Sequence, residues 1–310
     1  MSRLMQCGLM SWLVLGSPIA ARADDAEDKA FKFVEGLGGK VTRDEKLPGK
    51  PVVGVNLDGT KMTDAGLKEL APLKNLTTLN LGNTQVTGVG LKELAPLKNL
   101  TTLNLNSTRV TDAGLIELFA FKNLAILDLG NMREVIDPKV GDKDYRGEGK
   151  GVTDTGLKEI AKLTSLTTLT LSYTKVSDAG LKELAPLKNL TTLTTPKVTD
   201  QTLAVLREIN LLHALTQATN PNGSRPAKPE DVTGLNLSNT PLVTDMGLKE
   251  LATLKSLTYL GLYGTSVTDA GLKELTPLKT LTTLDLGYTK VTNAGVAELR
   301  KALPKCKISR

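Results

Sequence analysis

The sequence is poor in the residues on which many enzymes and disulfide-bonded proteins depend. Its 310 residues include two cysteines, one histidine and only 3% aromatic residues. A metal site built from histidine and cysteine is therefore nearly excluded, and the core must consist of aliphatic side chains, mainly leucine. The single histidine, His213, has apolar neighbours and no nucleophile or orienting acid at a recognisable spacing, so we interpret it as a packed or surface residue. The sequence also has no phosphate-binding loop and no dinucleotide fingerprint.

The first 23 residues have the pattern of an export signal. Arg3 supplies positive charge, residues 4–20 are mostly apolar, and Ala21-Arg22-Ala23 forms a small-residue cleavage site. We expect cleavage after Ala23 and a periplasmic or extracellular location. Cleavage removes two arginines and no acidic residue, so the formal net charge falls from +6 to +4. Cys306 is then the only cysteine, and no second apolar run approaches the roughly 20 residues of a membrane span.

The rest of the chain is dominated by an internal repeat. The segment V-T-D-A-G-L, or a close variant, recurs with spacings of 24, 24, 42, 24, 22, 45, 24 and 24 residues. Its first positions are Met62, Val86, Val110, Val152, Val176, Val198, Val243, Val267 and Val291. A period in the twenties is typical of a solenoid. A glycine recurs at one offset inside the segment, and close packing between adjacent units is the simplest reason for it.

Each unit predicts one strand followed by one short helix. Leu79 and Leu81 alternate with polar residues, as in a strand with one buried face. Thr63 can cap the helix that precedes this strand. Asp64 and Lys68 lie four residues apart in the favourable order, as do their counterparts in other units, so we expect these charges to form a solvated face. Because strands pack about 4.8 Å apart and helices about 8–10 Å apart, stacked units must form an arc with the strands inside.

The pattern L-x-x-L-x-L-x-x-T followed by V-T-D-A-G-L-K-E-L resembles the leucine-rich-repeat family, in particular its ribonuclease-inhibitor-like and F-box-associated branches, in a secreted bacterial version. The resemblance implies an α/β fold of about nine to ten repeats. It would be a right-handed solenoid, a horseshoe or arc, with a parallel sheet on the concave face and short helices on the convex face. It also implies protein binding, by analogy with the family. The family usually has Asn or Cys at the final Thr, and we interpret the threonines as a ladder whose hydroxyls bond to neighbouring backbone.

These observations divide the chain into a signal peptide (1–23), an N-terminal cap of a helix and a turn (24–51), and a solenoid (52–310). Two insertions interrupt the solenoid, at about 133–151 and 217–231. The first carries several acids, but Arg146 stands where a calcium loop needs a third Asp or Asn, so we interpret it as a polar loop. We expect the second to leave the helical side and to decorate the convex face or mark a join between two blocks.

A few side chains on the solvent-exposed face of the predicted strands do not belong to the repeated pattern. The candidate ligand-binding residues are Ile126, Asp128, Tyr259, Tyr263, Asp285 and Tyr288. Tyr259 and Tyr263 point to the same face, and exposed tyrosine is a common interface anchor, although packing between neighbouring rings would also explain them. Asp128 and Asp285 are predicted to lie roughly 24 Å apart. A glycosidase needs its two acids within about 9.5 Å, so we predict no catalytic pair.

The sequence therefore predicts a non-catalytic, monomeric recognition scaffold without metal or cofactor, which is exported and binds a protein or an envelope polymer on its concave sheet. One alternative is a secreted host-directed or adaptor-type effector, although no adaptor domain is visible. Another is a glycan-binding or carbohydrate-active protein that uses the concave Asn and Asp residues. Nucleic-acid binding is not expected, because the net charge is small and aromatic stacking platforms are scarce.

Overall fold

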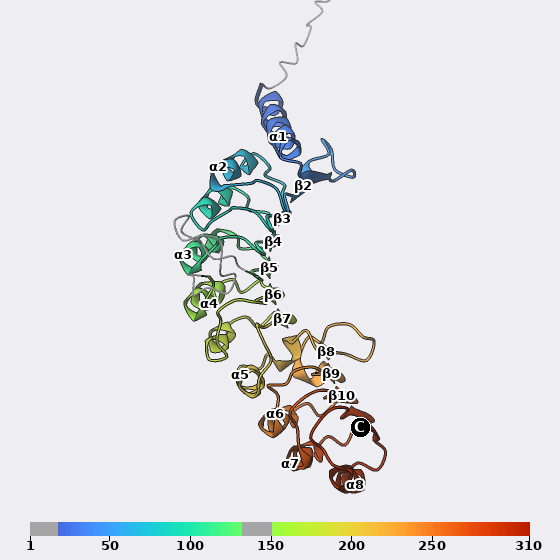
Figure 1. Ribbon diagram of the computed structural model, residues 1–310. Coiled ribbons are helices and arrows are strands. Elements are labelled where there is room, and N and C mark those ends of the chain that lie inside the picture. The colour runs from blue at the N-terminus through green and yellow to red at the C-terminus, as the bar shows by residue number, and fades with distance from the viewer. Residues whose placement is uncertain (1–17, 132–150) are drawn as a thin grey trace, which may run out of the picture.

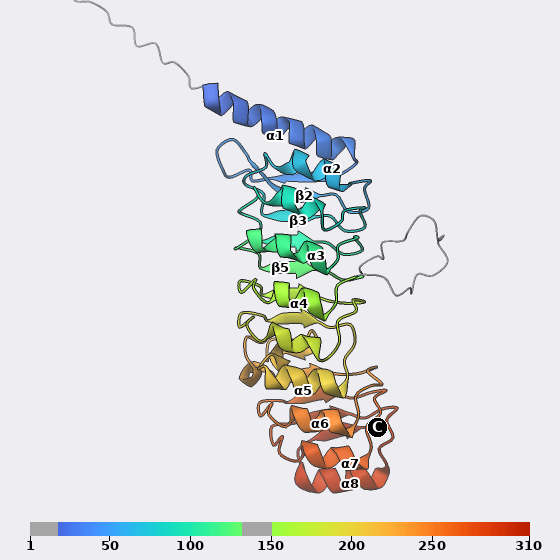
Figure 2. The same cartoon turned by 90° about the vertical axis from the view of Figure 1, so that its left-hand side faces the viewer.

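The chain folds into a curved solenoid of two layers (Figure 1). The computed structural model describes residues 18–131 and 151–310. The strands lie on the inner side of the arc and the helices on its outer side, and Figure 2 shows the helices stacked along the outer face. This arrangement confirms the predicted solenoid, with its parallel strands on the concave face and short helices on the convex face. The insertion predicted at 133–151 lies outside the described residues, except for Gly151.

The strands pair in register, one repeat apart. The first sheet contains β1 (Lys40–Arg43), β2 (Val52–Asn56), β3 (Thr78–Asn80), β4 (Thr102–Asn104), β5 (Ile126–Asp128), β6 (Thr168–Thr170) and β7 (Thr192–Thr194). The second contains β8 (Ala218–Thr219), β9 (Gly234–Asn236), β10 (Tyr259–Gly261), β11 (Thr283–Asp285) and β12 (Lys307–Ser309). β1 and β8 run antiparallel to β2 and β9, and the other neighbours are parallel. The repeat predicts strands near residues 52–58, 76–82, 100–106, 124–130, 166–172, 190–195, 232–238, 257–263 and 281–287, and each of these segments contains an observed strand.

The helical segments are short, and many are 3-10 turns. The α-helices are α1 (Pro18–Gly36), α2 (Asp64–Leu67), α3 (Asp112–Leu115), α4 (Asp154–Ile160), α5 (Asp200–Glu208), α6 (Asp245–Leu251), α7 (Asp269–Leu272) and α8 (Asn293–Ala302). The 3-10 helices are η1 (Lys68–Leu70), η2 (Gly90–Leu94), η3 (Ile116–Ala120), η4 (Gly180–Leu184), η5 (Leu212–Ala214), η6 (Pro229–Asp231) and η7 (Lys273–Leu275). Within residues 18–131 and 151–310, no helix is both long and apolar enough to cross a membrane.

Leucine fills the space between the two layers. In the β3 repeat, Leu79 and Leu81 are fully buried, whereas Thr78, which directly precedes Leu79, is exposed. Leu67 and Leu70 from the helical layer are also fully buried. Burying one leucine contributes roughly 1.5–3 kcal/mol, but a single repeat covers only one side of its own leucines. Each repeat therefore depends on its neighbours for its core.

The predicted threonine ladder is present, and each hydroxyl bonds within its own turn. The Thr84 hydroxyl donates to the Leu81 carbonyl at 2.6 Å, and the Thr265 hydroxyl donates to the Leu262 carbonyl at 2.7 Å. The same bond is made by Thr60, Thr108, Thr174, Thr240 and Thr289. The threonines thus satisfy a carbonyl at the end of each strand, where the ladder of the sheet stops.

A second ladder joins consecutive repeats at the helix starts. The carboxylate of Asp245 accepts the Thr268 N–H at 2.7 Å through Oδ1 and the Thr268 hydroxyl at 2.6 Å through Oδ2. The same pair of hydrogen bonds links Asp64 to Thr87, Asp112 to Thr153, Asp154 to Ser177, Asp200 to Thr244 and Asp269 to Thr292. The hydrogen bonds from the Thr292 hydroxyl and N–H lower the pKa of Asp269.

This ladder corrects the expectation that the repeated acid and lysine pairs form a solvated charged face. Asp64 points along the solenoid to the next repeat rather than to Lys68 on its own helix. Across the described ranges, no ion pair joins any of these acids to the lysine four residues later. The N–H and hydroxyl of a threonine offer two fixed donors, whereas an exposed lysine pair gains little after its side chains are ordered.

The recurrent glycine lies directly against this carboxylate. A methyl group on Gly271 would approach Asp245 Oδ1 to 2.3 Å, and one on Gly295 would approach Asp269 Oδ1 to 2.1 Å. In the one repeat with Gly88 in place of the aspartate, a methyl group on Gly114 would lie 2.2 Å from the Gly88 Cα. Close packing between adjacent repeats, which the sequence suggested, is therefore the reason for this glycine.

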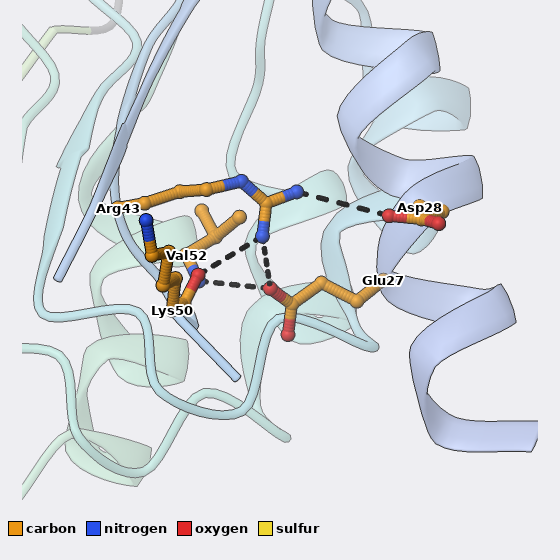
Figure 3. A network of polar contacts seen from close by, with 5 residues as sticks. All are labelled: Glu27, Asp28, Arg43, Lys50 and Val52. Atoms are coloured by element: carbon orange, nitrogen blue, oxygen red, sulfur yellow. Dashed lines mark hydrogen bonds and ion pairs between the residues drawn. The ribbon is translucent and has the colours of Figure 1, made fainter. Parts of the chain in front are cut away.

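At the N-terminal end, α1 packs on the β1–β2 hairpin through one arginine (Figure 3). The Arg43 guanidinium donates to Glu27 Oε1 at 3.2 Å and to the Lys50 carbonyl at 3.0 Å. Glu27 also accepts the Val52 N–H at 2.8 Å, and Arg43 lies 5.1 Å from the centroid of the Phe31 ring. These contacts lie after the predicted cleavage site, so they do not require residues 1–23.

The two sheets meet at a join where the repeat is interrupted. Leu215 forms a parallel bridge to Leu193 of β7, in the position of the next strand. The chain then turns back, and β8 runs antiparallel to β9. Arg225, in the connection between β8 and β9, donates to three carbonyls within residues 215–218 and to the Thr192 hydroxyl of β7. The arginine thus fastens this connection to the end of the first sheet.

Residues 217–231 therefore lie on the strand side of the solenoid (Figure 1). The expectation that they leave the helical side and decorate the convex face was wrong. The reason is that Leu215 already occupies a strand position, so the segment follows a strand rather than a helix. The prediction that it marks a join between two blocks is confirmed by the break between the two sheets.

We predict that Gly271→Ala destabilises the protein by about 1–3 kcal/mol, because the new methyl group must displace the Asp245 carboxylate from its two hydrogen bonds. Urea unfolding followed by circular dichroism measures the effect. Gly36→Ala is the matched control, since a methyl group there meets no atom within 4 Å. Equal midpoints for both variants would show that the glycine is not required by packing.

Candidate functional site

The structure separates the six candidate residues into two groups on the concave side. The first sheet carries Ile126 and Asp128, both on β5. The second block carries Tyr259 on β10, Tyr263 after it, Asp285 on β11 and Tyr288 after that. The connection of residues 217–231 lies between the two groups, since β8 and β9 stand between β7 and β10. Four candidates are therefore close to one another, and two lie apart from them.

An open hollow of about 700 Å³ lies at the end of the second sheet. The residues that line it include Tyr263, Asp285, Gly287, Tyr288, Ser309 and Arg310. The rings of Tyr263 and Tyr288 lie 4.9 Å apart between centroids and are inclined by 49°. The hollow therefore combines two aromatic rings with a carboxylate and a guanidinium, the groups that anchor many interfaces.

The charged groups of the hollow are held by their own hydrogen bonds. Asp285 Oδ1 accepts the Gly287 N–H at 3.0 Å and the Ser309 hydroxyl at 3.3 Å. Arg310 donates to Asn293 at the start of α8, at 2.6 Å. In the described part of the chain, no donor contacts Asp285 through Oδ2. One carboxylate oxygen in the hollow can therefore accept a hydrogen bond from a ligand.

Glycines make room for the tyrosine rings above the strands. A methyl group on Gly287 would lie 2.7 Å from the Tyr263 ring, and one on Gly261 would lie 2.8 Å from the Tyr259 hydroxyl. Both tyrosines remain 37% exposed. The rings thus pack partly on the sheet and partly face solvent, which is the environment of a rigid aromatic contact residue.

Tyr288 occupies a turn position at which the backbone is left-handed, with φ of 55°. The equivalent positions of other repeats carry Gly59, Asn83, Ser107, Asn131, Tyr173, Asn239 and Gly264. Glycine and asparagine adopt this conformation readily, but a bulky side chain does so at a cost. Tyr288 is 84% exposed and Tyr173 is 81% exposed, so core packing does not explain either ring. Our sequence reasoning missed Tyr173, although aligning the repeats on this turn would have found it.

Asp128 and Asp285 share a local role at the ends of their strands. Asp128 Oδ1 accepts the Gly130 N–H at 2.8 Å, just as Asp285 accepts the Gly287 N–H. Asn56, Asn80, Asn104 and Asn236 make the same turn. In each case the side-chain oxygen accepts a hydrogen bond from the backbone N–H two residues later, which stabilises the turn at the end of the strand. Ile126, at 40% exposure, lies in register between Thr102 and Thr168 and has no charged or aromatic residue beside it in that row.

His213 lies at the join and is only 2% exposed, so it is packed rather than part of an open site. Within the described residues, neither ring nitrogen has a hydrogen-bond partner. Burial lowers the pKa of His213, although the nearby Leu190 carbonyl and the Asp231 and Glu230 carboxylates favour the charged ring. Across residues 18–131 and 151–310, no group of three or more His, Cys, Asp or Glu side chains is arranged to hold a metal ion.

Four segments of the chain match the family model for the leucine-rich repeat, at residues 73–95, 97–119, 162–185 and 278–299. The chain is a leucine-rich-repeat protein. The matched repeats contribute to both sheets, so the two blocks are built from the same unit. The assignment to the ribonuclease-inhibitor-like and F-box-associated branches stays a prediction. No curated protein sequence matches the chain.

Solved structures similar to this leucine-rich-repeat protein include two internalins from Listeria monocytogenes. One internalin shares 19% identity at a TM-score of 0.41, over 96% of this chain and 98% of the internalin. Internalin C2 shares 18% identity at a TM-score of 0.37, over 91% and 92% of the two chains. A leucine-rich-repeat protein from Leptospira interrogans shares 22% identity at a TM-score of 0.31, over 78% and 74%.

We predict that mild acid destabilises the protein through His213. Its pKa is lowered in the folded state, so folding favours the neutral ring. The stabilisation is complete above the unfolded pKa of about 6.5 and decreases as the pH falls from there towards the lower folded value. The urea midpoint should drop between pH 7.5 and pH 5.5. His213→Leu should reduce that drop, and an unchanged pH dependence in this variant would assign the effect to other groups.

Proposed function

We propose that the protein is a non-catalytic, exported recognition scaffold that binds a protein partner through the concave side of its second sheet. The observation that carries this proposal is the position of Tyr263 and Tyr288 at the hollow that contains Asp285 and Arg310, with Tyr259 partly exposed on the adjacent strand β10. Leucine-rich-repeat proteins generally mediate protein binding, which supports the choice of a protein rather than a small molecule.

The physical properties of the surface suit a partner that arrives already folded. The tyrosines stand on strands whose backbone is fixed on both sides by neighbouring repeats, for example Tyr259 between Gly234 and Thr283. Aromatic side chains with few rotatable bonds lose little entropy on binding. The second sheet, β8 to β12, also offers an inner face against which a convex surface can pack.

The geometry supports recognition rather than catalysis. Asp128 and Asp285 stand on different sheets, and each uses one carboxylate oxygen to hold its own turn. His213 is buried at the join, away from the candidate hollow. The residues with acid–base chemistry are thus committed to the scaffold, whereas the tyrosines are left on the surface.

We predict that Tyr263→Ala/Tyr288→Ala weakens partner binding at least tenfold, because truncation of a central interface tyrosine commonly costs about 2 kcal/mol or more. Affinity capture from the envelope of the producing cell identifies the partner, and titration with the purified partner measures binding. Met246→Ala is the control, since Met246 is 73% exposed on the convex side and should not affect binding. Tyr173→Ala tests whether the first block also takes part.

Capture of the same partners with equal affinity by the tyrosine double variant and by wild type would reject the proposed surface. Capture of polysaccharide instead of protein would favour the glycan-binding alternative. Circular dichroism of each variant verifies that lost binding does not reflect lost structure.

Export is the second part of the proposal, and it predicts a mature chain that begins at Asp24. The N-terminal residues of the protein recovered from outside the cytoplasm should be determined by mass spectrometry. The mature chain should keep the unfolding midpoint of the full chain, because the contacts of α1 begin at Glu27. Recovery of full-length protein from the cytoplasm alone would contradict export.

A further inference from the structure

One lateral edge of the solenoid carries a series of exposed lysines, one from each of most repeats. It is formed by the turns that lead from each helical segment to the next strand, and Figure 2 shows the two edges on either side of the stacked helices. The exposed lysines of this edge, here called the lysine row, are Lys74, Lys98, Lys122, Lys188, Lys255, Lys279 and Lys305. The turns themselves span residues 71–77, 95–101, 119–125, 161–167, 185–191, 209–215, 252–258, 276–282 and 302–306, and none contains Asp or Glu.

The other faces of the solenoid mix both charges. The helical face alternates lysine and glutamate, as in Lys68-Glu69 and Lys92-Glu93. The opposite edge has basic residues too, but it also carries the aspartate ladder that begins at Asp64. The small net charge of the chain therefore conceals an edge on which positive charge predominates, with acidic residues only at its first turn, where Glu27 and Asp28 lie beside Lys74, and at the join, where Glu230 and Asp231 lie near His213, among the described residues.

The lysine row is held in place by the scaffold and has no ionic partner. Asn99 donates from Nδ2 to the Lys74 carbonyl at 2.9 Å, and Asn123 does so to the Lys98 carbonyl at 3.2 Å. Thr280 donates to the Lys255 carbonyl at 2.7 Å. Each of these contacts fixes the backbone of one lysine to the next repeat. In the described residues, no member of the row forms a salt bridge.

The spacing of the row suits a linear chain of negative charges. Neighbouring lysines belong to neighbouring repeats, so their backbones lie between the strand spacing of about 4.8 Å and the helix spacing of about 8–10 Å. The row is one residue wide and follows the whole solenoid, with neutral interruptions such as Thr164. A single line of flexible ammonium groups complements a flexible polyanion better than it complements a broad surface.

We propose that the lysine row binds an acidic polysaccharide along the edge of the solenoid, independently of the tyrosine surface. A nucleic acid fits less well, because the turns that carry the row have a single exposed ring, Phe119, and the Lys122 ammonium lies over it at 2.9 Å. A lipid bilayer fits less well, because the row is a single file rather than a patch, and the exposed apolar side chains beside it, Phe119 and Leu47, are too far apart in the row to form one inserting face.

Heparin, a sulfated polysaccharide, is the probe for this surface. Affinity for heparin at moderate salt should fall about tenfold or more in Lys74→Gln/Lys98→Gln/Lys122→Gln, because three contacts that release counterions are lost. Lys68→Gln/Lys92→Gln/Lys158→Gln removes the same charge from the helical face and should lower affinity less than about threefold by the same argument. Lys74→Arg/Lys98→Arg/Lys122→Arg should retain binding, and unfolding midpoints establish that each variant is folded.

Three results would overturn the proposal. One is no binding of wild-type protein to heparin, and another is equal weakening by the two glutamine triples, which would indicate net charge alone. The third is tighter binding to single-stranded DNA or to anionic vesicles than to heparin, again dependent on the row. The tyrosine variants should bind heparin normally, so failure of this proposal is distinguishable from failure of the proposed protein-binding surface.

Discussion

The structure depends on one constraint, which is that adjacent repeats must stay at the distance of hydrogen-bonded strands. Only at this distance do the leucines of one repeat cover those of the next. On the helical side, the Asp245 carboxylate bonds to Thr268, and Gly271 lies against it without a side chain. Where Gly88 replaces the aspartate, Gly114 packs against its backbone instead. The two layers are thus tied together by different means at a common spacing, and the difference in their preferred spacings bends the solenoid.

This constraint explains which residues recur and which are free to differ. Positions of leucine, threonine, aspartate and glycine serve the contact between repeats, so they carry no information about a ligand. Tyr259, Tyr263 and Tyr288 stand on the same scaffold but make no contribution to the ladders. Tyr288 even adopts a left-handed turn that favours glycine or asparagine. The proposed polysaccharide-binding surface arises differently. The lysine row consists of a repeated residue whose copies the fold aligns along one edge.

The join between the sheets is the place where the regular pattern fails. Leu215 continues the first sheet by a single bridge, after which the chain reverses and the second sheet begins. Arg225 supplies hydrogen bonds to carbonyls that a regular next strand would otherwise have reached. His213 is enclosed there, without a hydrogen-bond partner among the residues that the structure describes, which makes this region sensitive to protonation. The concave face is consequently divided into two halves with different side chains.

The sequence by itself determined the repeat, the strand positions, the buried leucines and the turn role of the threonines, because these follow from local periodicity and from the side chain's own backbone. It also identified the tyrosines as departures from the repeat. Three features were decided only by the tertiary structure. The aspartates bond to the following repeat and not to the lysines nearby in sequence, residues 217–231 lie on the strand side, and lysines from separate repeats form one row. Each of these features depends on contacts or alignment between repeats. The sequence pattern gives the spacing of residues along the chain, but it does not show which residue of the adjacent repeat a side chain contacts.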